Sequence, residues 1–248
     1  MLGCLLVFFI FGICIGSFLN VCIYRIPKKE NITTTRSHCM ECGNVIKWYD
    51  LVPVLSFIIL GGKCRYCKTK LSAQYPIIEL LNGLLYCLVY AVMGLSIRTV
   101  LTCAVCSALL VIAVIDWRTY EIPFGLNVFI GCIGVINLTF DYQNFVNYLV
   151  GAICVSGFLF ILYIITKGRG IGGGDIKLMA AAGLFLGWKS IILALVIGCI
   201  LGSIIHLIRM KVSKAEHVLA FGPYLAAGIL ISSLWGNDLI GLYLSFYF

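Results

Sequence analysis

Two aspartates stand where long apolar stretches of this chain meet short polar loops. Asp116 opens the segment Asp-Trp-Arg-Thr-Tyr-Glu-Ile-Pro (116–123), and Asp175 follows three glycines in Gly-Gly-Gly-Asp-Ile-Lys (172–177). Carboxylates at the edge of an apolar segment are costly, which indicates a function. Two neighbouring carboxylates cannot both ionise cheaply, so such a pair keeps one proton at neutral pH. The ionised member can activate water while its partner polarises a carbonyl, which is metal-free peptide hydrolysis.

Each aspartate also has an ordinary explanation. Asp175 can be a helix cap behind a glycine turn, and Asp116 can be an interfacial partner of Arg118 or Lys177. Two such carboxylates on one side of a membrane favour the catalytic interpretation.

The glycines before Asp175 support the same interpretation. Gly172 and Gly174 allow the backbone to bend and to approach a bound peptide closely. They also place Asp175 near a helix N-terminus, where the helix dipole favours a negative charge.

Four cysteines form two Cys-x2-Cys pairs separated by 21 residues: Cys39, Cys42, Cys64 and Cys67. This spacing is typical of a tetrahedral zinc site with four thiolate ligands. Two disulfides are the alternative, but they rarely persist in a reducing compartment. With every ligand position filled, the predicted role is structural. His38 could replace one ligand, although an exposed loop histidine is the simpler interpretation.

The composition predicts an all-α polytopic membrane protein. Apolar residues make up 62% of the 248 residues, and the mean hydropathy is +1.07. Runs long enough to cross about 30 Å of hydrocarbon give about eight transmembrane helices, of which the sixth is short, or seven if the sixth and seventh form a broken pair. The predicted spans are 2–24, 75–94, 98–116, 122–139, 146–166, 175–187, 189–209 and 220–247.

The predicted domains are a first transmembrane helix (1–24), a cytoplasmic zinc module (25–73) and a membrane domain (74–248). Alternating the loops between the two sides puts sixteen of the eighteen Lys and Arg residues on one side. That side is the cytoplasm by the positive-inside rule, so both termini lie outside. Both aspartates then lie at cytoplasmic helix ends. Anionic lipid is a sufficient partner for the basic loops, and nucleic acid is not required.

The module contains a ten-residue apolar segment (51–60) that is too short to cross a bilayer. It forms either the core of the module or a surface against the lipid interface, and its length favours the interface.

Four further polar residues fall within predicted spans. Glu79 could contact a substrate amino terminus or a methyl-donor site, or it could anchor the module by a hydrogen bond or be a snorkelling interfacial acid. We expect His206 to be a satisfied core histidine, Asp238 to mark a helix break or an outside turn, and Asn20 to bond across helices.

Several motifs occur in order along the chain. They are Gly-Ser-Phe-Leu-Asn-Val (16–21), Tyr-Arg-Ile-Pro (24–27), the paired cysteines, Asp-Leu-Val-Pro-Val-Leu-Ser (50–56), Tyr-Pro-Ile-Ile-Glu (75–79), the two aspartate motifs and Phe-Gly-Pro (221–223). In this combination the chain resembles the type IV prepilin leader peptidases, polytopic aspartic proteases of the bacterial plasma membrane. The Gly-x-Gly-Asp element alone is shared with presenilin-like proteases.

The resemblance implies that Asp116 and Asp175 are the catalytic pair, within an aspartic peptidase domain at 74–248. It implies type IV prepilin or pseudopilin precursors as substrates, cut on the cytoplasmic side after a glycine and before a hydrophobic helix. It also implies N-methylation of the new amino terminus with S-adenosylmethionine, for which the sequence shows no fingerprint and no assignable binding residues. One departure is Phe124, where the family usually has an acidic residue.

Two other functions are open to the residues themselves. A proton-coupled transporter uses membrane carboxylates as relays, but it usually places them near the midplane of repeated halves. A zinc-stabilised membrane scaffold explains the cysteines and leaves both aspartates without a role.

Overall fold

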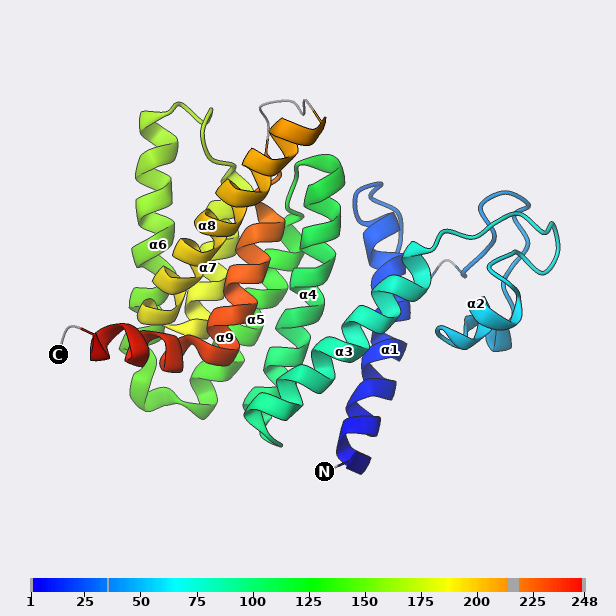
Figure 1. The fold of residues 1–248 in the computed structure, drawn as a ribbon, viewed down its shortest axis with the longest axis horizontal. Helices are drawn as coiled ribbons and strands as arrows, with labels where there is room; N and C mark the ends of the chain where they lie inside the picture. Colours follow the sequence, from blue (N-terminus) through cyan, green and yellow to red (C-terminus); the bar gives the residue numbers. More distant parts are fainter. Residues whose placement is uncertain (1, 35, 214–218, 247–248) are drawn as a thin grey trace. The chain divides into compact units, whose positions relative to one another are not determined.

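The computed structural model shows a helical chain and describes residues 2–34, 36–213 and 219–246 (Figure 1). The long helices in this part are α1 (Leu2–Arg25), α3 (Gln74–Met93), α4 (Ile97–Thr119), α5 (Phe124–Phe140), α6 (Phe145–Ile165), α7 (Gly173–Leu186), α8 (Trp188–Ser213) and α9 (Gly222–Ser245). The short helical turns are η1 (Trp48–Leu51), α2 (Leu55–Ile59) and η2 (Tyr142–Asn144).

Each long helix corresponds to one predicted span, so the all-α polytopic fold is confirmed. Among the described residues, six helices are long and apolar enough to cross a membrane: α1, α3, α4, α6, α8 and α9. The remaining two are α5, a shorter apolar helix of 17 residues, and α7, which has 14 residues. At about 1.5 Å per residue α7 is about 21 Å long. Whether α5 and α7 cross the membrane stays a prediction.

Packing divides the chain into two compact units, Met1–Thr99 and Val100–Phe248. The three-part division at residues 24 and 73 rests on composition and chemistry, and it stays a prediction.

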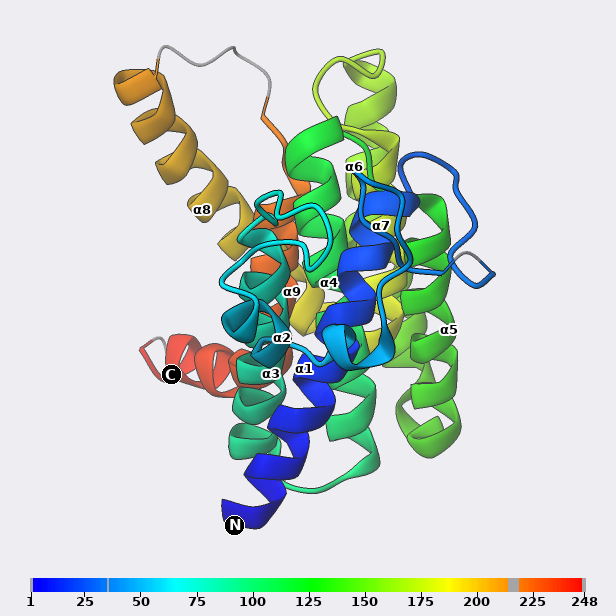
Figure 2. The same ribbon diagram turned by 90° about the vertical axis from the view of Figure 1, so that its right-hand side faces the viewer.

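In the first unit, α1 packs on α3 through two glycines one helical turn apart (Figure 2). A Cβ at Gly12 would lie 2.7 Å from the Cα of Gly83, and one at Gly16 would lie 2.7 Å from the Cα of Glu79. The Asn82 side chain donates a 2.8 Å hydrogen bond to the Gly12 carbonyl. Small residues at this spacing allow apolar helices to approach closely, and larger ones would force them apart.

Asn20 joins the same two helices nearer to the module. Its Nδ2 atom donates to the Tyr75 carbonyl over 3.1 Å, and its Oδ1 atom accepts from Gln74 over 3.3 Å. The predicted interhelical hydrogen bond is confirmed.

The apolar segment of the module is largely exposed. In α2, Leu55, Ile58 and Ile59 keep 58%, 66% and 78% of their surface accessible. These side chains therefore do not form the core of the module, which favours the lipid-interface alternative. Contact with lipid stays a prediction.

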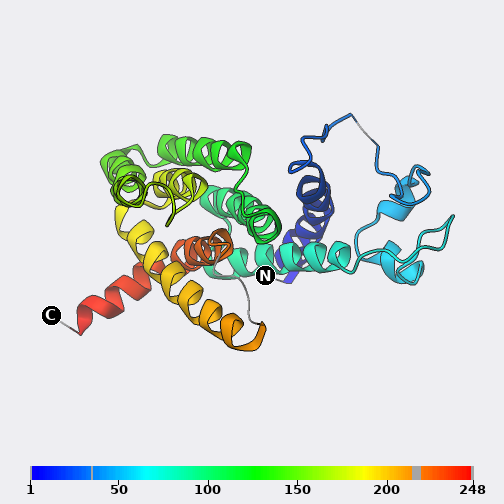
Figure 3. The same cartoon turned by 90° about the horizontal axis from the view of Figure 1, so that it is seen from above.

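In the second unit, α7 packs against α5, α6, α8 and α9 (Figure 3). Leu178, Met179 and Ala182 of α7 are completely buried. Gly183 of α7 lies against the Gly151 backbone of α6, where neither position has room for a side chain. Gly187, at φ +83°, separates α7 from α8. The helix that begins near Asp175 is thus held on several sides, and it meets α8 at a glycine break.

The contact between α1 and α3 leads to a test. Replacing Gly12 by Leu should lower the thermal unfolding midpoint of the detergent-purified protein, because overpacking a tight contact typically costs about 1–3 kcal/mol or more. Gly3 lies on the same helix with no neighbour within 4 Å, so Gly3→Leu should leave the midpoint nearly unchanged. Equal midpoints for the two variants would contradict this helix contact.

Candidate active site and metal centre

Asp116 lies in the last turn of α4 with 5% of its surface exposed. Its Oδ2 atom accepts a 2.8 Å hydrogen bond from the N–H of Gly222, the first residue of α9. A Cβ at Gly222 would lie 2.8 Å from the same oxygen. The first N–H groups of a helix have no partner within it. The carboxylate therefore satisfies one of these donors, and glycine permits the close approach.

Asp175 is the third residue of α7 and is 8% exposed. Its Oδ2 atom accepts a 3.2 Å hydrogen bond from the N–H of Gly172, the residue that precedes the helix. The helix cap considered from the sequence is therefore present. It uses one carboxylate oxygen, and the positive end of the helix dipole favours the charged form.

The loop behind Asp116 packs on the glycines in front of Asp175. A Cβ at Gly174 would lie 2.9 Å from the Cβ of Ile122. Asn127 of α5 lies across the same contact, with its Nδ2 atom 3.5 Å from the Gly174 carbonyl. The loop that follows Asp116 and the turn that precedes Asp175 are therefore in contact. The structure thus brings the two aspartate motifs together within one unit, and the catalytic role of Asp116 and Asp175 stays a prediction.

The three glycines are not equivalent. A Cβ at Gly172 would lie 3.0 Å from Oδ2 of Asp175, and the Gly174 position is closed by Ile122, whereas Gly173 has no neighbour within 4 Å. Glycine is therefore required at positions 172 and 174 but not at 173, in agreement with the Gly-x-Gly-Asp pattern. The supporting roles predicted for Gly172 and Gly174 are compatible with this geometry and stay predictions.

The role of Gly222 was not predicted from the sequence. The Phe-Gly-Pro motif contributed only to the resemblance, although proline in the first turn marks a helix start. A helix start exposes unpaired N–H groups. That signal indicates a donor, but it does not identify an acceptor 106 residues away.

Phe124, the departure from the family pattern, faces a cation. The Nζ atom of Lys177 lies 5.2 Å from the centre of its ring. Lys177 therefore makes a cation–π contact with the residue at position 124. An acidic residue at that position would form an ion pair with Lys177 instead.

The four predicted ligand cysteines converge in the first unit. Their sulfur atoms all lie within 4.8 Å of one another, and Sγ of Cys39 is 3.8 Å from Sγ of Cys67. Four sulfurs at about 2.3 Å from a tetrahedral zinc would be about 3.8 Å apart. The thirteen cysteines, all within the described residues, are free thiols. The set Cys39, Cys42, Cys64 and Cys67 can therefore hold a metal ion.

The two Cys-x2-Cys turns share one backbone pattern. The Gly43 N–H donates to the Cys39 carbonyl at 2.9 Å, and the Lys68 N–H donates to the Cys64 carbonyl at 3.1 Å. Gly43 and Lys68 occupy the left-handed region at φ +69° and +59°. The second turn is the strained one, because lysine tolerates this conformation less well than glycine.

The environment of the cluster favours ionised sulfur. Hydrogen bonds with Thr69 lower the pKa of the Cys67 thiol to about 6, so Cys67 is a thiolate, the metal-binding form, at neutral pH. His38 instead bonds to the Arg36 carbonyl through Nδ1 over 3.0 Å. The loop interpretation of His38 therefore fits the structure.

Glu79 anchors the module to α3. Only 6% of it is exposed, and its Oε2 atom accepts a 2.7 Å hydrogen bond from the N–H of Val54. Val54 lies at φ +62°, and the Leu55 N–H bonds to the Pro53 carbonyl across it. This is a γ-turn of the rare, strained kind. The anchoring alternative for Glu79 is thus what the structure shows.

The two remaining polar residues lie elsewhere. Asp238 is exposed within α9, whose helical hydrogen bonding continues through it although the helix bends sharply toward its C-terminal end (Figure 1). The expected helix break or outside turn at Asp238 stays a prediction. Nδ1 of His206 is buried with no hydrogen-bond partner among the described residues. The expectation of a satisfied histidine is therefore wrong for that atom.

Two family profiles match the chain. One, described as the bacterial peptidase A24 N-terminal domain, covers residues 10–93. The other, described as the type IV leader peptidase family, covers residues 103–207. The paired cysteines fall in the first match, and both aspartates fall in the second.

Curated relatives match most of the chain, and each is named prepilin leader peptidase/N-methyltransferase. One from Burkholderia pseudomallei strain K96243 is 33% identical over 92% of this chain and 84% of its own length. One from Bacillus subtilis strain 168 is 32% identical over 96% of this chain and 97% of its own. One from Aeromonas salmonicida strain A449 is 31% identical over 96% and 92%. No solved structure gives a significant match.

The sulfur geometry predicts about one zinc ion per chain in gently purified protein. Cys42→Ser or Cys67→Ser should abolish that stoichiometry, because a structural site needs all its thiolates. Cys132→Ser, outside the cluster, should retain the metal. Elemental analysis after gel filtration measures the content, and a value near zero for the unaltered chain would contradict the site.

Proposed function

Because the chain belongs to the type IV leader peptidase family, we propose that Asp116 and Asp175 are the catalytic pair of a membrane aspartic endopeptidase that removes the leader of type IV prepilins or pseudopilins. One observation carries the assignment. Two buried carboxylates stand at the end of α4 and the start of α7, whose adjoining loops meet at Ile122 and Gly174, and each accepts a hydrogen bond from a backbone N–H at a helix start. The transporter and scaffold alternatives are not favoured.

The proposed reaction uses the second oxygen of each carboxylate. The hydrogen bonds from Gly222 and Gly172 hold Oδ2 of Asp116 and of Asp175. The ionised member takes a proton from water through Oδ1, and the resulting hydroxide attacks the scissile carbonyl. The protonated member donates its proton to the carbonyl oxygen. Collapse of the tetrahedral intermediate then breaks the C–N bond as the leaving amine gains a proton from the pair.

The chain is a multi-pass membrane protein, and we place its active site at the cytoplasmic face of a bacterial plasma membrane. The support is the concentration of Lys and Arg on the side where Asp116 and Asp175 lie, together with the positive-inside rule. The substrate would then present its leader to the cytoplasm while its hydrophobic helix stays in the bilayer.

Two cofactors belong to the proposal. The four cysteines fit Zn²⁺ by sulfur spacing and by donor type, with no open position for water, so the ion would be structural. The names of the relatives include N-methyltransferase, which supports S-adenosylmethionine as the methyl donor for the new amino terminus. We assign the zinc module to 25–73 and the peptidase chemistry to 74–248.

Replacing either aspartate by Asn should abolish cleavage of a prepilin in membranes or micelles. Asn neither accepts the proton of water nor donates one, so the loss should be at least about 10³-fold. Gel analysis of precursor and mature pilin measures it, and Asp141→Asn, outside the pair, is the matched control. Full cleavage by either Asp116→Asn or Asp175→Asn, at normal abundance, would refute the assigned pair.

Gly222 and Gly173 provide a second test of the geometry. Gly222→Ala places a methyl group against the Asp116 carboxylate, and a misplaced catalytic group can cost about 10²-fold in rate. We therefore expect a marked loss of kcat with retained protein abundance. Gly173→Ala meets open space and should retain nearly full activity. Equal rates for the two variants would remove Gly222 from the site.

A further inference from the structure

The exposed apolar face of α2 has no role in the proposed peptidase chemistry. Leu55, Ile58 and Ile59 stand at positions i, i+3 and i+4, so they share one side of the helix. Each is more than half exposed. Large apolar side chains grouped on a surface mark a contact with a partner or with a membrane.

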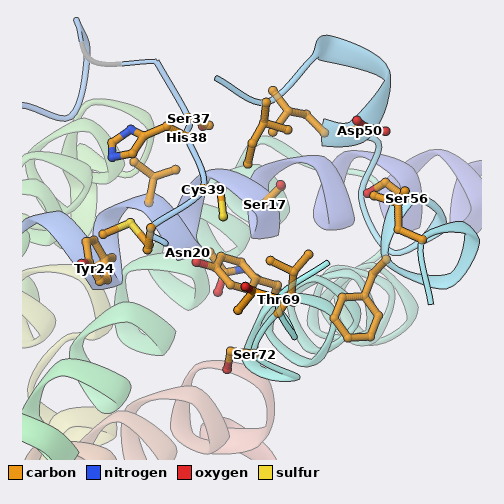
Figure 4. Close-up of a pocket in the computed structure, with 18 of the residues that line it drawn as sticks. Ser17, Asn20, Tyr24, Ser37, His38, Cys39, Asp50, Ser56, Thr69 and Ser72 are labelled. Atoms are coloured by element: carbon orange, nitrogen blue, oxygen red, sulfur yellow. Dashed lines mark hydrogen bonds between the residues drawn. The ribbon is translucent and has the colours of Figure 1, made fainter. Parts of the chain in front are cut away.

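The opposite face of α2 is turned toward the helix pair α1 and α3. Ser56, Phe57 and Leu60 line a cavity of about 350 Å³ between the module and these two helices. Figure 4 shows Ser17 and Asn20 on α1 and Ser56 on α2 around this cavity. One face of α2 is therefore seated against the helix pair, and the apolar face lies on the other side.

A hydrogen bond sets the position of α2 along the membrane helices. Val54, the residue before α2, donates to Glu79, which lies five residues inside α3 from its first residue, Gln74. Glu79 also packs on Gly16 of α1, nine residues before Arg25 at the end of that helix. At about 1.5 Å per residue, the start of α2 lies about 8 Å from the end of α3 and about 14 Å from the end of α1.

The first unit therefore places α2 beside α1 and α3 and not beyond their ends (Figures 1 and 2). Both long helices are apolar enough to cross a membrane. An apolar helix in the membrane interface is buried about 5–10 Å into the boundary between head groups and acyl chains, and the position of α2 along α3 falls in this range. Lipid can reach the exposed face at this depth, whereas a water-soluble partner cannot.

The charges around α2 are compatible with a lipid surface. Residues 51–62 carry no charge. The acidic group next to them, Asp50, forms two hydrogen bonds of 2.6 and 2.8 Å with the Arg65 guanidinium. Lys63 and Lys68 are exposed after the apolar segment. Basic side chains beside an inserted apolar face are attracted to anionic head groups.

We propose that α2 enters the bilayer, with Leu55, Ile58 and Ile59 among the acyl chains of the leaflet at the C-terminal end of α1. This leaflet is the cytoplasmic one in the proposed orientation. The exposed Trp48 then lies at the level of the head groups, where tryptophan is enriched. The cysteine module is thereby held to the membrane by α2 as well as by α1 and α3. This contact depends on the membrane-spanning helices and not on the peptidase chemistry.

Photo-crosslinking tests the contact in the full chain. p-Benzoylphenylalanine replaces Ile58 or Ile59, and the purified protein is placed in nanodiscs of phosphatidylethanolamine and phosphatidylglycerol. After irradiation, the intact mass should increase by one phospholipid for both positions. Tyr66, an exposed aromatic residue of the module, is the matched control. Its segment, 61–73, lies nearer to the C-terminal end of α1 than α2 does (Figure 1), so its lipid adduct should be about tenfold weaker or less.

A charged variant gives a second measurement that needs no crosslinker. Ile58→Glu places a carboxylate among the acyl chains, which is costly. Amide hydrogen exchange of residues 51–60 in the same nanodiscs should therefore become about tenfold faster. Tyr66→Glu should leave exchange in this segment unchanged. Both side chains are exposed, so neither substitution opens a cavity in the core of the module.

Phospholipid adducts at Ile58 and Ile59, with little at Tyr66, would support the insertion of α2. Absence of a lipid adduct at both α2 positions, equal adducts at Tyr66, or equal exchange in the two Glu variants would overturn it. A cross-link from α2 to an added prepilin or to a second copy of the chain, in place of lipid, would overturn it as well and assign this face to a protein. Neither measurement depends on cleavage, so loss of the proposed peptidase activity would leave the result unchanged.

Discussion

Two carboxyl groups kept out of bulk water are the constraint on which the proposed site depends. A buried carboxylate must receive hydrogen bonds or be neutralised. Asp116 and Asp175 each receive one from the backbone N–H of a glycine at a helix start, Gly222 and Gly172. Backbone donors are fixed in place and add no charge of their own. The pair can therefore exchange a proton without a permanent ion pair fixing one protonation state. This arrangement explains why glycine, and not a larger polar residue, surrounds both carboxylates.

The same lack of a side chain sets the helix packing. Gly12 and Gly16 allow α1 to meet α3, and Gly183 allows α7 to meet the Gly151 backbone of α6. Apolar helices gain little from hydrophobic burial within lipid, so close backbone approach supplies much of their attraction. In the second unit these contacts fix the height and direction of α7, which determines where Asp175 lies relative to the end of α4. Helix packing and the proposed chemistry thus both depend on glycines that leave room for close approach.

Local features were predicted well from the sequence. The helices follow from the lengths of apolar runs, and the cysteine cluster follows from two spacings of Cys-x2-Cys. Both aspartates stand at helix ends because polar loops begin beside them. Partners distant in sequence escaped prediction: the contact of Gly222 with Asp116, and the hydrogen bond from Val54 to Glu79. Neither pattern nor propensity reports which donor meets which acceptor. The prediction for His206 was wrong for the same reason, because the residue type does not reveal that Nδ1 has no hydrogen-bond partner among the described residues.

The unequal lengths of α6 and α7 have a consequence for hydration. From the crossing of Gly151 and Gly183, α6 continues for 14 residues to Ile165, whereas Asp175 lies eight residues from that crossing. At about 1.5 Å per residue these stretches are about 21 Å and about 12 Å, so the loop 166–172 descends to reach α7 (Figure 1). Irregular backbone at such depth persists only against protein or in a wet inlet, because lipid offers it no hydrogen bonds. In the proposed peptidase, an inlet of this kind along the descending loop would bring solvent toward the carboxylates, where the reaction consumes water.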